Sequence, residues 1–395
     1  MMLGLLLARA GIGVTVLEKH GDFLRDFRGD TVHPSTLQLM HELGLLDAFL
    51  ARPHDKAYEI RASVGGQEAV VADFRRLKTR CGFIAMVPQW EFLDFLREHA
   101  SLYPGFHLRM NAEATELVRS QGRVTGVLAR TPQGELRIDA DLVIGADGRR
   151  STLRQAAGLK VRDLGAPIDV LWMRIAKQPA DPSGSGGRIG AGGFLAMIDR
   201  GSYWQCAYVI RKDGFSAIQS RGIEAFRADF ATLVPLFAGR LEHELAGWES
   251  VKLLSVSVDR LERWWQPGLL CIGDAAHAMS PIGGVGINLA IQDAVATANL
   301  LWRTLADPSC GADAITPLLR QLQARRMLPT RVIQAMQVVA QNNVIDPVLG
   351  STRTPSMPLL LKLLNRFPAL RAIPAHVIGV GVRPEHVRSP RELRR

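Results

Sequence analysis

Three short apolar runs, each stopping at a glycine or an acidic residue, are the first sign of organisation in the chain. They are residues 14–17 (VTVL), 142–144 (LVI) and 269–272 (LLCI). Unbroken runs of Val, Ile and Leu are typical of strands buried on both faces, as in a parallel sheet. The first run ends at Glu18, the second just before Asp147 and the third at Gly273. Ligands of open α/β sheets bind beyond the carboxyl ends of such strands, so these positions are candidate site residues.

A helical pattern follows the third run. From residue 286 onward, apolar side chains recur at helical spacing over about twenty residues, at Leu289, Ile291, Val295, Ala298 and Leu301. Gly283, Gly284 and Gly286 come just before this helix. A helix start offers free N–H groups and the positive end of the helix dipole, and glycine lets a ligand approach the main chain. The pattern predicts a site for a polar or anionic ligand, with a plain structural loop as the alternative.

Between residues 159 and 248 the pattern changes to alternation. Residues 168–175, 193–198 and 203–210 alternate as strands of an antiparallel sheet do. Residues 222–237 then form a helical pattern, and the chain from residue 308 is mostly helical, with several prolines after residue 346. The predicted fold class is therefore α/β: a parallel-sheet domain, an inserted antiparallel-sheet domain and C-terminal helices.

Composition narrows the class of protein. The chain has 395 residues, of which 47% are hydrophobic and 22% charged, enough for a large core in two domains or one elaborated domain. The net charge of +10 could indicate nucleic-acid binding, but the basic residues are scattered apart from a small cluster of Arg388, Arg391, Arg394 and Arg395. No basic face interleaved with aromatic residues is visible in the sequence, which argues against nucleic acid.

The cysteines and the apolar segments indicate the cellular compartment in which the protein is expected. The four cysteines have no metal-ligand spacing and are expected to be free thiols in a reducing cytoplasm. The apolar run at residues 359–364 is too short to span a bilayer. The start of the chain, residues 1–10, is apolar but lacks the basic segment of a secretory signal, so a helix is expected there instead.

Glu18 and Lys19 stand where a Rossmann-type fold grips the ribose of an adenine dinucleotide, with a surface ion pair as the alternative. In such folds the carboxylate comes about 20 residues after a GxGxxG turn that itself follows the first strand. Counting back from Glu18 by that distance runs off the start of the sequence. The expectation is a Rossmann-like parallel sheet whose N-terminal strand and glycine turn are missing.

The segment from Gly273 to Asn288 resembles the GD motif of class A flavoprotein monooxygenases, the family of para-hydroxybenzoate hydroxylase. The matching strings are GDAAHAMSP and GGVGINLAIQDA. The resemblance implies that Asp274 binds the ribityl chain of FAD and that Pro281 lies beside the isoalloxazine ring. It also implies that the backbone of Gly286, Ile287 and Asn288, with Gly284 before it, faces the pyrimidine edge of the flavin. His277 is expected to be a buried, hydrogen-bonded structural residue.

Three further segments resemble the same family. Residues 136–148 are similar to its DG motif, which implies that Asp147 and Gly148 serve FAD and NAD(P)H binding, and Ser151 is expected to cap the helix that follows. Arg28 matches an arginine that contacts the flavin or the phosphates of the pyridine nucleotide, with a solvated arginine as the alternative. Gln89, at the start of a predicted helix, matches a glutamine that touches the adenosine part of FAD.

The resemblance implies an FAD-dependent oxidoreductase. NAD(P)H reduces FAD, and one atom of O2 passes to an aromatic or related small substrate; a positively charged surface would attract NADPH phosphates and anionic substrates. No side chain stands out as a general base. Two alternatives stay open: a flavin reductase or dehydrogenase of the same fold, and a non-catalytic remnant that binds a ligand without FAD.

The resemblance also implies a division of the chain. An FAD-binding domain is expected over residues 1–60, 84–160 and 250–345, a substrate domain over 61–83 and 161–249, and a C-terminal helical extension over 346–395. The substrate pocket can be lined by Trp172, Met173, Phe194, Tyr203, Trp204 and Tyr208, although such aromatics are more often plain core. The expected state is a cytoplasmic monomer or homodimer with no metal, no membrane contact and no nucleic-acid partner.

Overall fold

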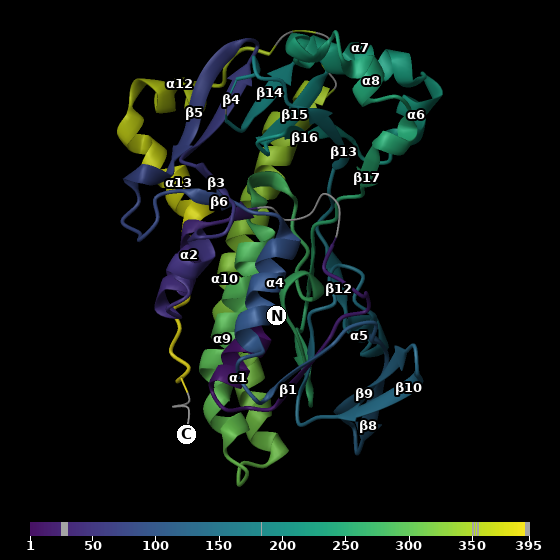
Figure 1. The fold of residues 1–395 in the computed structure, drawn as a ribbon, viewed down its shortest axis with the longest axis vertical. Helices are drawn as coiled ribbons and strands as arrows, with labels where there is room; N and C mark the ends of the chain where they lie inside the picture. Colours follow the sequence, from purple (N-terminus) through teal and green to yellow (C-terminus); the bar gives the residue numbers. More distant parts are fainter. Residues whose placement is uncertain (25–30, 183, 350, 352, 354, 392–395) are drawn as a thin grey trace.

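The computed structural model describes residues 1–24, 31–182, 184–349, 351, 353 and 355–391. Figure 1 shows an elongated molecule with a large mixed sheet at the top and a long pair of helices running along its lower part. This pair is α9 (Gly286–Ala306) and α10 (Ile315–Ala340). Segment 25–30, which includes Arg28, lies outside the described residues.

The predicted parallel strands are present as two separate pieces of sheet. β1 (Val14–Leu17) pairs in parallel with β7 (Phe106–Arg109), and β11 (Val143–Gly145) pairs in parallel with β20 (Leu269–Cys271). β19 (Trp265–Gln266) adds an antiparallel edge to β20. Because Gly145 is opposite Cys271 in the register, the loops after β11 and β20 leave the sheet at the same edge.

Helices cover these strands and form the largest core. α1 (Met2–Arg9) packs on α9 and on α4 (Gln89–Ala100), and α9 packs on α10. α1 is buried along most of its length because it is almost wholly apolar, and Leu5 and Leu6 have almost no exposed surface. The apolar positions predicted for α9 are buried. Burial of this stripe stabilises the long helix at the point where its first turn meets the loop after β20.

The second sheet has seven strands, in the order β17-β13-β16-β15-β14-β4-β5. The bounds are β17 (Lys252–Leu254), β13 (Ile168–Ala176), β16 (Tyr203–Arg211), β15 (Gly193–Asp199), β14 (Gly186–Gly190), β4 (Glu59–Val64) and β5 (Gln67–Asp73). The three predicted antiparallel runs are β13, β15 and β16. One face of this sheet is covered by α7 (Ile223–Leu233), whose Phe226 and Phe230 enter a dense apolar core.

The remaining elements are short. The small sheets contain β8 (Glu113–Ser120), β9 (Arg123–Thr131) and β10 (Gly134–Asp139); β2 (Thr31–Val32), β6 (Ile84–Met86) and β3 (Asp55–Ala57); and β12 (Val161–Asp163) with β18 (Asp259–Leu261). The other helices are α2 (Pro34–Glu42), α3 (Leu46–Leu50), α5 (Thr152–Ala156), α6 (Phe215–Ser220), α8 (Leu241–Glu244), α11 (Asp346–Leu349), α12 (Leu359–Arg366) and α13 (Ala372–Gly379). Single turns are η1 (Phe74–Arg76), η2 (Pro235–Phe237), η3 (Trp248–Ser250), η4 (Gly273–Ala275), η5 (Ile282–Gly284), η6 (Ala312–Ala314), η7 (Gln341–Ile345) and η8 (Pro368–Arg371).

One local prediction differs from the structure. The helix predicted for residues 222–237 ends at Leu233, because Pro235 cannot continue it, and a separate turn follows.

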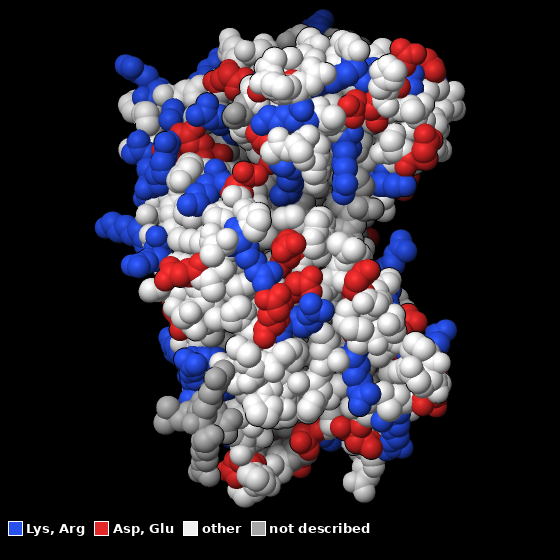
Figure 2. Space-filling model, viewed as in Figure 1, with Lys and Arg blue, Asp and Glu red and all other residues white. Residues whose placement is uncertain are grey.

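Of the helices in the part of the chain that the structure describes, none is both long enough and apolar enough to cross a bilayer. Basic and acidic side chains are interspersed on the face shown in Figure 2.

Candidate flavin site

The loop after β20, residues 272–285, is called the GD loop below. It begins at Gly273, whose φ of +58° favours glycine, and a Cβ there would lie 2.9 Å from the Cβ of Ala290 on α9. Glycine therefore lets the GD loop lie directly against α9. Asp274 follows in η4 and is half-buried.

The end of the GD loop is held against the β2–α2 segment. Gly284 has a φ of +62°, and a Cβ there would lie 2.5 Å from the Thr31 hydroxyl, which donates to the Gly284 carbonyl at 3.2 Å. The buried Asn288 side chain accepts from the His33 N–H at 3.0 Å and from the Thr36 hydroxyl at 2.7 Å. The side-chain amide of Asn288 thus holds the loop in place. Only the backbone of Asn288 is left to bind a ligand.

The first turn of α9 presents hydrogen-bond donors. Among the described residues, the backbone N–H groups of Gly286, Ile287 and Asn288 have no acceptor, as expected at a helix start. Gly286 and Ile287 are half-buried, and so is Pro281 nearby. The positive end of a 21-residue helix therefore faces outward beside the GD loop, a suitable place for an anionic group.

His33 adds a buried polar atom at the same place. Its Nδ1 donates to the Ile378 carbonyl of α13 at 2.8 Å, while its Nε2 has no hydrogen-bond partner within the described residues. A Cβ on Gly284 would lie 3.5 Å from this Nε2. Burial lowers the pKa of His33 to about 4, against a raising effect of the Ile378 bond, so the ring is neutral and Nε2 is an acceptor.

A buried network of charges holds the start of the GD loop from behind. Asp293 on α9 accepts from the Gly273 N–H at 3.1 Å, from His277 Nε2 at 2.6 Å and from Arg326 Nε of α10 at 2.8 Å. Arg326 also contacts Glu385 at 3.4 Å, and all of these side chains are almost fully buried. Burial acts to raise the pKa of Asp293, but the charges and hydrogen bonds of His277 and Arg326 outweigh it and lower the pKa. The expected structural role of His277 is confirmed.

A row of glutamines on α10 and η7 holds the middle of the GD loop. The row is Gln334, Gln337 and Gln341, all buried. Their loop partners are the carbonyl oxygens of Ala278, Ser280 and Ile282, together with the N–H and the hydroxyl of Ser280. The position of Pro281 is therefore determined on both sides by bonds to one helix.

The loop after β11, residues 146–151, is called the DG loop below, and it is held by its own residues. The Asp147 carboxylate accepts from the Ser151 hydroxyl at 2.5 Å and from the Leu153 N–H at 3.2 Å. Ser151 in turn accepts from the Arg154 N–H at 3.0 Å, so the predicted cap at Ser151 is confirmed. Gly148 has a φ of +86°, which places the turn between the strand and α5 in a conformation that favours glycine.

The other predicted site residues lie near the first helix and strand. Glu18 follows β1, is half-buried and interacts electrostatically with the N-terminal amino group of Met1, just before α1. Lys19 beside it is exposed, and Gln89 is the first residue of α4, half-buried. α1, which precedes β1, packs on both α4 and α9.

A family model described as an FAD binding domain matches residues 1–328. The chain belongs to this family. The 6-methylpretetramide 4-monooxygenase of Streptomyces rimosus is 31% identical over 374 residues, which cover 94% of this chain and 88% of the relative. Two solved structures share the fold. One is pqsL, a probable FAD-dependent monooxygenase from Pseudomonas aeruginosa, with a TM-score of 0.72 and 21% identity over 87% of this chain and 93% of that one. The other is p-nitrophenol 4-monooxygenase from Pseudomonas putida DLL-E4, with a TM-score of 0.69 and 18% identity over 95% and 90%.

As a member of the FAD-dependent monooxygenase family, the chain is an oxidoreductase with FAD as cofactor and NAD(P)H as the co-substrate typical of the family. The residues present fit FAD: the free N–H groups of α9, the unpartnered His33 Nε2 and the glycine loop offer a polar cradle. When bound, FAD supplies the redox chemistry with oxygen. No cluster of His, Cys, Asp or Glu suited to a metal ion occurs among the described residues.

One face of the seven-stranded sheet lies toward the GD loop. Trp172 and Phe194 are on this face and pack in one cluster with Ile282. Met173, Trp204 and Tyr208 are on the other face, under α7. For Met173, Trp204 and Tyr208 the structure therefore supports the alternative of plain core, because side chains alternate between the faces of a sheet.

Sequence reasoning missed the residues that hold the GD loop. Asp293 lies within the apolar stripe of α9, and a charge on a buried helix face needs a buried partner. Gln334, Gln337 and Gln341 recur at helical spacing on one face of α10 and its continuation η7. The buried acid and the spaced glutamines are both visible in the sequence, but neither pattern indicates which residues they contact.

Proposed function

We propose that this monooxygenase hydroxylates a small aromatic substrate with FAD, NAD(P)H and O2. One oxygen atom enters the substrate, the other leaves as water, and NAD(P)H supplies the electron pair. The observation that carries the proposal is the start of α9, where free N–H groups beside a tightly held glycine loop face outward. The names of the relatives support an aromatic substrate, since one is a 6-methylpretetramide 4-monooxygenase and a protein of the same fold is a p-nitrophenol 4-monooxygenase.

The chain contributes position and electrostatics to this reaction. The N–H groups of Gly286, Ile287 and Asn288 would stabilise negative charge on the pyrimidine edge of the flavin, and Asp274 would accept from ribityl hydroxyls. Glu18 and Gln89 would hold the adenosine end, and Asp147 with Gly148 would border the site at the DG loop. Lys19 and Arg28 would face phosphate groups. We assign no general base.

We also propose that different parts of the chain bind FAD and cover the substrate. Residues 1–60, 84–160 and 250–345 would bind FAD, residues 61–83 and 161–249 would cover the substrate, and residues 346–395 would brace the site. The covering role is supported by the packing of Ile282, next to Pro281, on the sheet face that carries Trp172 and Phe194. A monomer or homodimer in the cytoplasm is the state proposed.

The test begins with the purified protein and its flavin. We expect a yellow protein whose flavin is reduced by NADH or NADPH without oxygen, faster when an accepted phenol is present. Turnover under ¹⁸O2 should then place one labelled atom in the product, detected by mass spectrometry. Oxygen consumption with hydrogen peroxide as the only product, over a broad panel of phenols and heteroaromatics, would support the reductase alternative instead.

Adjacent residues on opposite sheet faces test the covering role. Trp172→Phe changes the face toward the GD loop, and Met173→Leu, a volume-conserving change that costs below about 1.5 kcal/mol, changes the face under α7. We expect the KM for substrate and the ratio of product to NAD(P)H to change in Trp172→Phe only. Equal effects in the two variants would remove this sheet face from the substrate site.

A further inference from the structure

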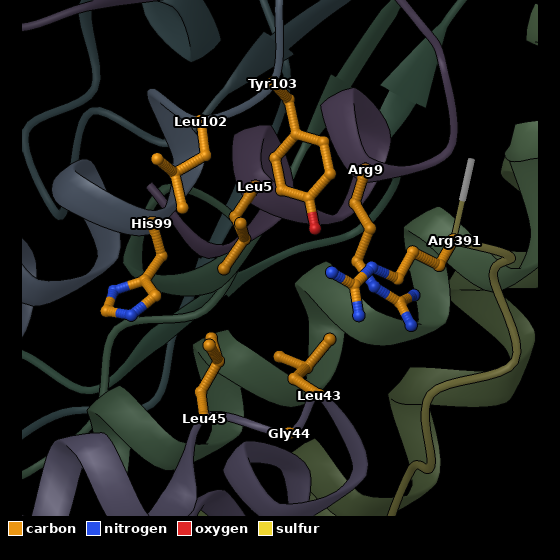
Figure 3. A pocket seen from close by; sticks show the side chains of 9 residues that line it. All are labelled: Leu5, Arg9, Leu43, Gly44, Leu45, His99, Leu102, Tyr103 and Arg391. Atoms are coloured by element: carbon orange, nitrogen blue, oxygen red, sulfur yellow. The ribbon is translucent and has the colours of Figure 1, made fainter. Parts of the chain in front are cut away.

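A pocket lies at the C-terminal end of α1, apart from the GD loop and the DG loop. Figure 3 shows side chains from three separate parts of the chain pointing into it: the end of α1, the end of α4 and the turn between α2 and α3, with Arg391 entering from the C-terminal segment. The cavity has a volume of about 130 Å³. None of its lining residues belongs to the predicted flavin site.

The pocket contains two guanidinium groups side by side. Arg9 donates to the carbonyl oxygens of Ser389 and Pro390 at 3.0 and 3.1 Å, which directs its side chain toward Arg391. Burial lowers the pKa of Arg9, interaction with Tyr103 raises it, and the positive charge of Arg391 lowers it further. The two cations are therefore close enough to repel one another.

The described residues supply no counterion for this pair. Neither Arg9 nor Arg391 forms an ion pair with any described carboxylate, and the polar groups beside them are carbonyl oxygens and the Tyr103 phenol. A guanidinium group presents several N–H donors in a plane that matches the two oxygens of a carboxylate. Bringing two of them together without an acid is favourable when an anion occupies the space between them.

The rest of the wall is mostly apolar, with His99 as a further polar side chain. Leu5 lies at the base and is almost fully buried, and Leu43 and Leu45 line the side that faces the arginines. A dry cavity of about 150 Å³ lined by apolar side chains holds a benzene ring. The pocket thus combines space for one ring with a cationic rim.

We propose that this pocket binds a small organic carboxylate whose apolar body is about the size of one ring. The carboxylate contacts Arg9 and Arg391, the Tyr103 hydroxyl donates to it, and the apolar body lies on Leu5, Leu43 and Leu45. The inference does not depend on the hydroxylation proposed above, because the pocket shares no residue with the flavin site and its occupancy can be measured without turnover.

Benzoate is the probe, titrated into the purified full chain by isothermal calorimetry at low ionic strength. Arg391→Gln is the decisive variant, because Arg391 is exposed and its loss should not disturb folding. Arg388→Gln is the matched control: it is three positions away, removes the same charge and does not line the pocket. We expect the affinity for benzoate to fall about tenfold or more in Arg391→Gln and to change little in Arg388→Gln.

Further ligands and a further variant separate the contributions of the carboxylate charge, the apolar wall and Arg9 to binding. Benzyl alcohol, which keeps the ring but lacks the charge, should bind at least about tenfold more weakly than benzoate. Inorganic phosphate should compete poorly, because it cannot use the apolar wall. Arg9→Gln should weaken benzoate as Arg391→Gln does, and a circular dichroism spectrum identical to that of the parent chain would exclude misfolding.

Two results would overturn the proposal. Benzoate affinity that is unchanged in Arg391→Gln would mean that benzoate binds elsewhere, for instance at the flavin site. Equal losses in Arg391→Gln and Arg388→Gln would mean that benzoate responds to the overall positive charge of the C-terminal segment and not to the pocket.

Discussion

The loop that follows β11 is held by its own residues, whereas the loop that follows β20 is held by residues from elsewhere in the chain. In the DG loop, Asp147 binds Ser151 and Leu153 within one turn, and a helix of only 5 residues follows. In the GD loop, the supporting groups come from Asp293, Arg326 and the α10 glutamines.

The two loops therefore differ in what holds them, although their sequence patterns are similar. The Asp147 carboxylate uses one bond to each of its oxygens to stabilise its own turn, which leaves fewer acceptor positions for a ligand. A loop braced from behind keeps its outward side available, because its backbone is satisfied by buried groups. The two loops are also linked, since the buried Arg154 of α5 contacts Asp259 and the Ala275 carbonyl of the GD loop.

The largest effect is expected from removing the charge behind the GD loop. Asp293→Ala leaves the buried Arg326 with only its longer contact to Glu385, and breaking a buried ion pair in this way costs about 3–5 kcal/mol. Urea unfolding should show this loss, whereas Asp313→Asn, an exposed control, should stay within about 0.5 kcal/mol of the parent chain. A loss below 1 kcal/mol in Asp293→Ala would mean that the network does not brace the loop.

A pH effect of similar size is expected from His33. Because its folded pKa is lowered from 6.5 to about 4, the unfolded chain binds a proton in this range that the folded chain does not. Stability should therefore fall as the pH drops from about 6.5 to about 4, by at most roughly 3 kcal/mol. His33→Asn should lose this part of the pH dependence, and the exposed His107→Asn should keep it. A parallel pH profile for the parent chain and His33→Asn would contradict the assignment.

A smaller effect, on ligand binding and not on folding, is expected at Asp274. If its carboxylate accepts from the ribityl chain, Asp274→Ala should weaken FAD binding by about 1.5–3 kcal/mol, as for hydrogen bonds to charged groups. Flavin fluorescence during titration of the apoprotein measures this. Asp147→Ala serves as the comparison from the DG loop, with a weaker effect on FAD. Unchanged FAD affinity in Asp274→Ala would remove this residue from the site.

The smallest effect is expected at the self-capped turn. Ser151→Ala removes a helix cap, which costs about 1 kcal/mol. Because Ser151 and Asp147 act through one another, the double variant with Asp147→Ala should cost less than the two single changes added together. Thermal unfolding of the three variants tests this, and strict additivity would show that the two side chains stabilise α5 independently.

Much of the fold could be predicted because its signals are local. The strands at residues 14–17 and 269–271, the helix from Gly286 and the cap at Ser151 all follow from apolar runs, periodicity and short-range hydrogen bonding. The resemblance to a known family supplied the cofactor, which local patterns alone do not specify.

The remaining features depend on partners that are distant in the sequence. The buried acid at Asp293 is visible in the pattern of α9, but Arg326 becomes its partner only through the packing of α9 on α10. Alternation separates Trp172 from Met173, yet only the position of α7 decides which of them is covered by a helix. Tertiary packing determines both the partner of Asp293 and the sheet face that a helix covers. The alternating sequence pattern is the same for the two faces of the sheet.

The edge of the seven-stranded sheet has a consequence for synthesis on the ribosome. β5 ends the sheet, and its backbone is completed by Asn365 of α12, which donates to the Glu68 carbonyl and accepts from the Val70 N–H. Asn365 and Glu68 are 297 residues apart along the chain. The β4–β5 hairpin therefore emerges early and keeps both of its edges open until β14 and then α12 have been made. Open strand edges are sites of aggregation, so the yield of folded protein should depend on chaperones that shield this hairpin during translation.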